Sequence, residues 1–284
     1  MEHNTASNIV KTPFSCARDG LTIRGHIFRA AQTKTAAKSG KCAEAREKSV
    51  QTRQTAKGEK SPIIILSHGF LGDESQLVTY AEALANIGYT AITFDFNGGS
   101  PESTSSGKSV DMTVLTEKAD LLAIINYAES LENTDTNNIS LVGFSQGGFV
   151  SALVAAELKD KIKKLILFFP ALCIPNDARN GNMLVMSFDP NNVPPIICEK
   201  PMIIGRNYAL TAQKLDAYKE ISGYDGKTLI IHGTADKVVN IEYSRKAQNV
   251  YKNIIYKEIE GADHGFTGTD DEEAIRTMVD FCNL

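Results

Sequence analysis

The sequence predicts an α/β fold with a mainly parallel central sheet and helices on both of its faces. Strand-like and helix-like segments alternate through most of the 284 residues, as expected when each parallel strand is followed by a crossover helix. The strand-like segments include uninterrupted aliphatic runs such as residues 63–67, which are typical of strands covered on both faces. A proline-rich, irregular stretch at residues 171–226 predicts a small cap inserted after a core strand.

The predicted elements follow one another in a regular order. Residues 14–29 are expected to form a strand pair around the turn Arg18-Asp19-Gly20. Further strands are predicted at residues 63–67, 90–94, 139–142, 164–169, 228–232 and 254–259. Helices are predicted at residues 77–87, 121–128, 146–158, 243–250 and 275–282. Residues 1–170 and 227–284 are therefore expected to form one catalytic domain, with residues 171–226 as its cap.

Residues 31–60 differ in composition from the rest of the chain. They are rich in Lys and Arg, contain no aromatic residue and have Val50 as their only large aliphatic side chain. So little apolar surface cannot offset the conformational entropy lost on ordering. We expect a basic, flexible surface insert within the catalytic domain.

The overall composition excludes several classes of function. A formal net charge of −4 argues against a nucleic acid or an anionic membrane as partner. The five cysteines are far apart and form no C-x-x-C pair, so no metal site is indicated. Residues 1–20 lack the pattern of a secretory signal, and no apolar run approaches the ~20 residues of a membrane span. We expect a cytoplasmic protein with a small-molecule substrate; its oligomeric state is not predicted.

The main catalytic signal is Gly143-Phe144-Ser145-Gln146-Gly147, which follows a predicted strand and precedes a predicted helix. A serine on such a sharp strand-to-helix turn exposes its hydroxyl, and the glycines of this nucleophile elbow avoid collisions within the turn. Ser145 is therefore the candidate nucleophile. The alternative is a glycine turn that contains an incidental serine.

Two further residues complete a candidate triad in the chain order Ser, Asp, His. Asp236 and His264 each follow a predicted strand, so they are expected at the same sheet edge as Ser145. His68 and His232 are rival bases, but each ends a strand before a glycine and is expected to pack or hydrogen-bond locally. Asp263 is rejected as the triad acid because its neighbour in sequence, His264, would be poorly oriented by it.

The segment Ser67-His68-Gly69-Phe70 comes directly after the first core strand. An oxyanion hole needs two backbone N–H groups, typically one from this loop and one from the residue after the nucleophile. The amides of Phe70 and Gln146 are the candidate donors. The Phe70 side chain is free to pack in the core at the same time.

Together these stretches resemble the α/β-hydrolase family, and more closely its cinnamoyl-esterase-like and lysophospholipase-like bacterial branch. The matching segments are S-H-G-F-L-G (67–72), F-D-F-N-G-G (94–99), G-F-S-Q-G-G (143–148), H-G-T-A-D-K-V-V (232–239) and G-A-D-H-G-F (261–266). The resemblance implies a serine carboxylesterase that uses an acyl-enzyme and needs no metal or organic cofactor.

We expect hydrolysis of esters with short-to-medium or small aromatic acyl groups. Some apolar residues of the cap are expected to pack on the core and the rest to line the acyl pocket with Phe70. These are Met183, Leu184, Val185, Met186, Phe188, Ile196, Ile197, Met202 and Tyr208. Alternative functions are a lysophospholipase or monoacylglycerol lipase, an amide or peptide hydrolase, an acyltransferase, and a non-catalytic ligand-binding protein on the same scaffold.

Overall fold

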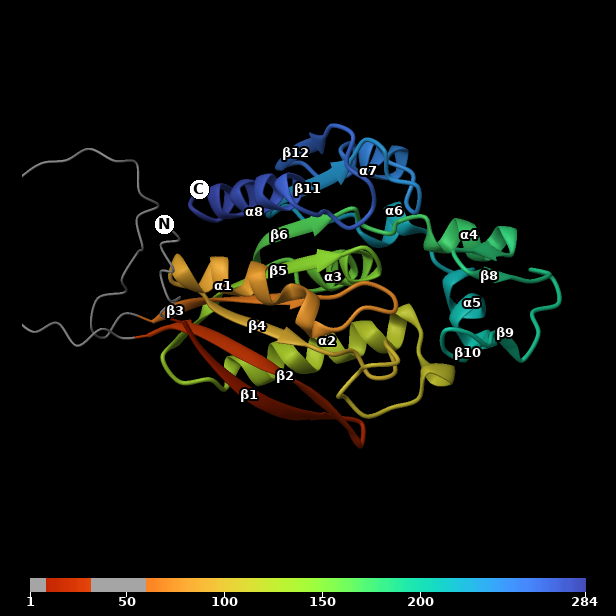
Figure 1. The fold of residues 1–284 in the computed structure, drawn as a ribbon, viewed down its shortest axis with the longest axis horizontal. Helices are drawn as coiled ribbons and strands as arrows, with labels where there is room; N and C mark the ends of the chain where they lie inside the picture. Colours follow the sequence, from red (N-terminus) through yellow and green to blue (C-terminus); the bar gives the residue numbers. More distant parts are fainter. Residues whose placement is uncertain (1–8, 32–59) are drawn as a thin grey trace, which may run out of the picture.

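An eight-stranded sheet in the order β1-β2-β4-β3-β5-β6-β11-β12 runs through the protein (Figure 1). The structure is a computed structural model and describes residues 9–31 and 60–284. The strands are β1 (Ile9–Arg18), β2 (Leu21–Ala30), β3 (Ser61–Ser67), β4 (Thr90–Phe94), β5 (Thr134–Phe144), β6 (Ile162–Phe168), β11 (Lys227–Gly233) and β12 (Ile254–Ile259). All neighbours from β4 to β12 are parallel, whereas β1 and β2 form an antiparallel hairpin at one edge. The predicted mainly parallel sheet is confirmed.

Helices cover both faces of the sheet, as the sequence predicts. They are α1 (Val78–Asn86), α2 (Val114–Glu129), α3 (Gln146–Glu157), α7 (Glu242–Ala247) and α8 (Thr269–Cys282), with short 3-10 turns η1 (Glu74–Leu77) and η2 (Ser109–Asp111). Helices α1 and α8 contribute to one hydrophobic core cluster and α2 and α3 to the other. The central strand β3 is buried from Ile63 to Ser67, which agrees with its uninterrupted aliphatic sequence.

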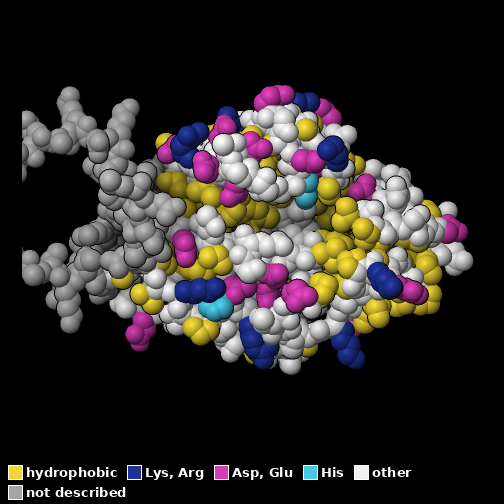
Figure 2. Space-filling model, viewed as in Figure 1, with side chains coloured by type: hydrophobic (Ala, Val, Ile, Leu, Met, Phe, Trp, Pro, Cys, Tyr) yellow, Lys and Arg dark blue, Asp and Glu magenta, His cyan; other side chains and the backbone are white. Residues whose placement is uncertain are grey.

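The segment 171–226 contains only short elements. They are α4 (Ile174–Asn180), α5 (Arg206–Ala212), α6 (Ala217–Glu220), β7 (Asn182–Met183), β8 (Met186–Ser187), β9 (Ile196–Cys198) and β10 (Ile204–Gly205). Figure 1 shows α4, α5, β9 and β10 beyond the ends of β5 and β6, whereas α6 lies close to α3. Hydrophobic side chains gather on the surface of this end of the molecule (Figure 2).

Two elements start earlier than the hydrophobic pattern predicts. Strand β5 begins at Thr134, which pairs with Ser61 of β3. A register shift follows this first pairing, and the apolar part of β5 pairs with β3 only after the shift. Helix α2 begins after Thr113, which forms a capping box with Thr116. Its first turns bury the acidic residue Glu117, so the apolar spacing is interrupted there.

The basic insert predicted at residues 31–60 lies, apart from its two end residues, outside the described part of the chain. Within residues 9–31 and 60–284, no helix has the length and apolarity needed to cross a membrane.

Candidate active site

Ser145 occupies the turn between β5 and α3, where the sequence predicts the nucleophile. Its backbone has φ 51° and ψ −116°, a strained conformation for a residue with a side chain. Backbone hydrogen bonds tie the turn to the neighbouring strand end, including one from the Ser145 amide to the Phe168 carbonyl at 3.0 Å and one from the Ala171 amide to the Ser145 carbonyl at 2.9 Å. Ser145 thus lies at the carboxyl end of β5, and it is partly exposed.

The glycines around Ser145 permit close backbone contacts. A Cβ atom on residue 143 would lie 2.3 Å from the Gly147 carbonyl oxygen. A Cβ atom on residue 147 would lie 2.3 Å from the His68 carbonyl oxygen. Both distances are shorter than any tolerated contact, so a residue with a side chain at either position would push the turn out of place.

His264 lies next to Ser145 and Asp236 lies next to His264, although both follow Ser145 by about ninety positions or more in sequence. The Nε2 atom of His264 is 3.1 Å from the Ser145 Oγ, and its Nδ1 is 2.8 Å from the Asp236 Oδ2. Asp236 follows β11 and His264 follows the adjacent strand β12. The Phe169 ring packs against the His264 ring at a centroid distance of 4.5 Å. The structure thus brings the three predicted residues into one chain of hydrogen bonds.

The Asp236 carboxylate is buried and surrounded by hydrogen-bond donors. Its Oδ1 accepts from the backbone amides of Val238 and Val239, each at 2.8 Å, and its Oδ2 lies 3.1 Å from His232 Nε2. Burial alone would raise the pKa of Asp236, but the hydrogen bonds from His232, His264 and the Val239 amide hold it well below its usual range. Asp236 is therefore ionised next to His264.

The rejected candidates have other partners. His68 is buried, its Nε2 accepts from the Phe96 amide at 3.0 Å and its Nδ1 lies 2.8 Å from the Gly69 carbonyl oxygen. Burial lowers the pKa of His68, which keeps the ring neutral. Asp263 binds the backbone amide of Lys237 at 3.0 Å and the amide of His264 at 2.8 Å. Neither side chain is available to Ser145.

His232 was expected to form local hydrogen bonds, but sequence reasoning missed its contact with Asp236. Its Nδ1 lies 2.7 Å from the Ser244 Oγ, and its Nε2 lies 3.0 Å from the Val239 carbonyl oxygen. Because these contacts fix the ring and its Nε2 also lies 3.1 Å from the Asp236 Oδ2, His232 contributes to the position of the Asp236 carboxylate.

The loop with Phe70 lies against the nucleophile. A Cβ atom on residue 69 would lie 3.1 Å from the Ser145 Cβ and 3.7 Å from its Oγ, so Gly69 lets this loop approach Ser145 closely. Among the described residues, the amides of Phe70 and Gln146 donate to no carbonyl or side chain. Both are therefore free to bind a developing negative charge.

A small cavity of about 50 Å³ opens beside Ser145. Its lining is Phe70, Ser145, Gln146, Ala171, Cys173, Ile174, Asp177, Met183, Leu184, Met186, Tyr208, Val238 and Val239. Four of the predicted cap residues line it, namely Met183, Leu184, Met186 and Tyr208. The other five, Val185, Phe188, Ile196, Ile197 and Met202, do not.

The five remaining residues have different surroundings. Ile197 and Met202 are buried in a hydrophobic core cluster, and Phe188 packs against it. Val185 and Ile196 are exposed. Cys173 and Asp177 line the cavity without having been predicted, because no motif marks them. Burial raises the pKa of both side chains.

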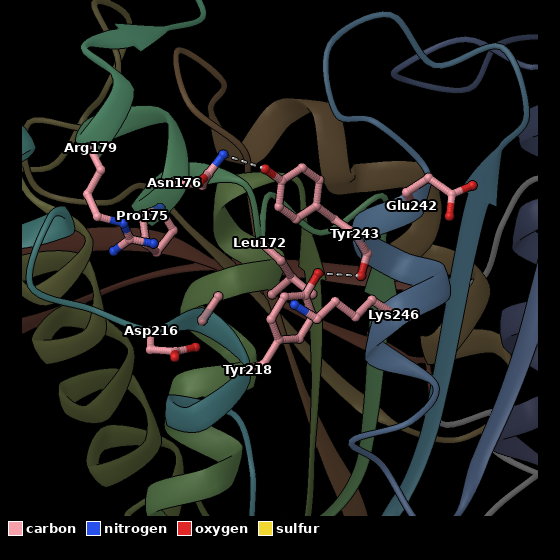
Figure 3. A pocket seen from close by; sticks show the side chains of 10 residues that line it. Leu172, Pro175, Asn176, Arg179, Asp216, Tyr218, Glu242, Tyr243 and Lys246 are labelled. Carbon is pink, nitrogen blue, oxygen red and sulfur yellow. Dashed lines mark hydrogen bonds between the residues drawn. The ribbon is translucent and has the colours of Figure 1, made fainter.

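A second, larger hollow of about 370 Å³ lies between α4, α6 and α7 (Figure 3). Tyr218 donates a hydrogen bond to the Tyr243 carbonyl oxygen at 3.1 Å, and Asn176 donates to the Tyr243 hydroxyl at 3.0 Å. None of the triad residues lines it, so the smaller cavity is the candidate active site. Among the described residues, no three His, Cys, Asp or Glu side chains are grouped so that they would hold a metal ion.

Two family models match the chain. The model described as alpha/beta hydrolase fold matches residues 62–178, and the model described as serine hydrolase (FSH1) matches residues 123–264, which is half of the chain. Two uncharacterized 31.7 kDa proteins from the traX-finO intergenic region of Escherichia coli are 36% and 39% identical over 109 residues. That match covers 38% of this chain, and the chain spans only 36% of the length of those relatives.

Solved structures resemble the whole described fold. Est1E from Butyrivibrio proteoclasticus, with ferulic acid bound, is 28% identical, with a TM-score of 0.78 over 95% of this chain and 100% of that chain. Mouse alpha/beta hydrolase domain-containing protein 10 is 16% identical, with a TM-score of 0.69 over 96% of this chain and 98% of that chain, and shows the shared fold alone.

Proposed function

The chain belongs to the family of serine hydrolases (FSH1), and we therefore propose that it hydrolyses carboxylic esters with Ser145 as nucleophile, His264 as base and Asp236 as acid. The observation that carries this proposal is the continuous hydrogen-bond chain from the Ser145 hydroxyl through His264 to Asp236, at 3.1 and 2.8 Å. A serine hydroxyl is too weak a nucleophile unless such a base removes its proton.

The reaction follows from this arrangement. His264 Nε2 takes the Ser145 proton while Oγ attacks the ester carbonyl carbon, and the imidazolium then donates that proton to the departing alcohol oxygen. The resulting acyl-enzyme is attacked by water, whose proton passes to His264, and the carboxylic acid is released as Ser145 regains its proton. The ionised Asp236 fixes the imidazole tautomer and stabilises the imidazolium in both steps.

The negative charge of the tetrahedral intermediate needs two donors in the same place. The backbone N–H groups of Phe70 and Gln146 take this role, since both lie beside Ser145 and have no other acceptor among the described residues. Gln146 is also the first residue of α3, where the helix dipole favours a negative charge.

We propose that residues 171–226 form a cap over the acyl pocket. The cavity is small, and its wall contains Met183 and Met186, whose flexible side chains adapt to different acyl groups. The similar protein Est1E has been solved with ferulic acid bound. These observations favour esters with short-to-medium or small aromatic acyl groups.

A fluorophosphonate probe and a series of p-nitrophenyl esters test this function. Ser145→Ala is expected to abolish labelling by the probe and to lower kcat by roughly 10⁶-fold. The kcat/KM values are expected to peak below the longest acyl chains, with methyl ferulate also hydrolysed. A maximum at palmitate would identify a lipase, and faster turnover of the matching p-nitroanilides would identify an amidase. Either result would overturn the proposed specificity.

A further inference from the structure

Behind the proposed oxyanion hole, three buried polar side chains from different elements are connected. They are Glu117 of α2, Gln146 of α3 and Tyr208 of α5, each at most 2% exposed. The Gln146 Nε2 donates to the Glu117 Oε2 at 2.7 Å, and the Tyr208 hydroxyl donates to the Gln146 Oε1. Both ends of the Gln146 amide are therefore fixed.

The same network reaches the second proposed oxyanion donor. The Tyr208 ring packs against the Phe70 ring at a centroid distance of 6.0 Å, and both residues line the cavity beside Ser145. One line of contacts therefore runs from Glu117 through Gln146 and Tyr208 to Phe70. Gln146 and Phe70 within this line are the two residues whose backbone amides are the proposed oxyanion donors.

The buried position of Glu117 lowers the stability of the fold. No Lys, Arg or His of the described residues lies within ion-pair distance of it, whereas Asp120, one turn further along α2, is paired with Arg18 at 2.7 Å. A buried carboxyl group without a cationic partner destabilises a fold compared with an apolar residue of similar size. Packing alone therefore does not explain this side chain, whereas its hydrogen bond to Gln146 does.

We propose that Glu117 is a positioning residue for the oxyanion hole: it holds Gln146, and through Tyr208 also Phe70, so that both backbone amides point at the same oxygen. This inference rests on the proposed function. Glu117 touches no reacting atom, and its contribution is geometric. When preorganised donors stabilise an oxyanion, the reaction slows if those donors shift by even about 1 Å.

Glu117→Leu and Glu117→Gln separate this role from simple packing. Leu leaves the Gln146 amide nitrogen with only the weak acceptor Met112 Sδ at 3.8 Å, so kcat is expected to fall about 10- to 100-fold with KM nearly unchanged. Gln offers an acceptor oxygen at the same place and is expected to keep at least about a third of the wild-type kcat. A Leu variant with wild-type kcat, or equal losses in the two variants, would overturn the proposal.

Two controls keep the test decisive. Asp120→Asn changes the neighbouring buried carboxylate on the same helix and is expected to lower the melting temperature with kcat close to wild type. The triple variant Glu117→Leu/Gln146→Met/Tyr208→Phe removes all three buried polar partners, which restores stability without restoring their hydrogen bonds. Its kcat is expected to stay low although its melting temperature recovers; recovery of kcat as well would contradict a positioning role.

Labelling of the wild-type protein by the fluorophosphonate probe distinguishes the two proposals. If the wild type reacts with the probe and the Glu117 variants turn over normally, only the positioning role fails. If the wild type does not react, the proposed function fails, and the positioning role fails with it.

Discussion

Asp236 and Glu117 are buried carboxyl groups, and one intermediate residue connects each of them to Ser145. Their pKa values nevertheless move in opposite directions. Asp236 is linked to Ser145 through His264 and Glu117 through Gln146. The pKa of Asp236 is held below its usual range, whereas burial raises the pKa of Glu117 to about 8.

The number of donors accounts for this difference. Burial disfavours the charged form of both groups. Asp236 overcomes it with two backbone amides and two histidines, while Glu117 receives the hydrogen bond of Gln146 and also faces the charge of Asp120. Burial favours the neutral form of both acids, and only the acid with enough hydrogen-bond donors around it stays ionised. An ionised Asp236 suits a partner that becomes an imidazolium, and a protonated Glu117 puts no negative charge behind the oxyanion.

The largest expected contrast is in turnover. Asp236→Asn places an amide where His264 needs an ionised acceptor, so kcat on p-nitrophenyl butyrate is expected to fall by about 10⁴-fold. Glu117→Gln makes the same chemical change in the other carboxyl group and is expected to stay within about threefold of wild type. Asp236→Asn with more than a hundredth of the wild-type kcat would remove Asp236 from the triad.

A second contrast in turnover is expected between the two histidines that contact Asp236. His264→Ala removes the base and is expected to leave almost no turnover. His232→Ala removes one of several donors, so the Val238 and Val239 amides still hold the carboxylate and kcat is expected to fall about 10-fold. Initial rates of the two purified variants measure this difference in kcat, and circular dichroism establishes that both variants are folded. A more severe loss in His232→Ala than in His264→Ala would mean that the bases are wrongly assigned.

The two regions also differ in how far the sequence predicts them. Ser145, Asp236 and His264 each follow a strand of a parallel sheet, and the carboxyl ends of such strands meet at one edge, so motif and strand order together were enough to place them near one another. The mainly parallel sheet and the covering of both its faces followed from the same alternation of strands and helices, whereas the order of the strands within the sheet was not predicted.

Glu117 offered no comparable signal. It lies between Thr116 and Lys118, so the sequence around it looks like a solvated helix face. Its burial arises only when α2, α3 and α5 pack together, a tertiary event that no local pattern records. The cavity wall was partly missed for the same reason: the short elements of residues 171–226 lack a regular period, so which of Met183 and Met202 faces the cavity depends on packing.

The smallest expected effect is on stability, and its dependence on pH distinguishes the two acids. The pKa of Glu117 rises from 4.5 to about 8 on folding, so the folded protein holds this proton where the unfolded chain has released it. The contribution of Glu117 to stability therefore falls as the pH rises from about 4.5 to about 8, by an amount on the order of a few kcal/mol. Glu117→Gln has no proton to lose. Its melting temperature is expected to be close to wild type at pH 5 and higher by roughly 5 °C at pH 8.5.

Asp236→Asn provides the matched opposite case for this measurement. Because the pKa of Asp236 is lowered on folding, its ionised form stabilises the protein at every pH above the unfolded value of 3.8, and this stabilisation is lost only as the pH falls through the folded value. The Asn variant is therefore expected to melt below wild type by a similar margin at pH 5 and at pH 8.5. Thermal melts of the three proteins at both pH values test the comparison directly. A gap between Glu117→Gln and wild type that does not change with pH would show that Glu117 is already ionised at pH 5, and that the hydrogen bond from Gln146 outweighs its burial.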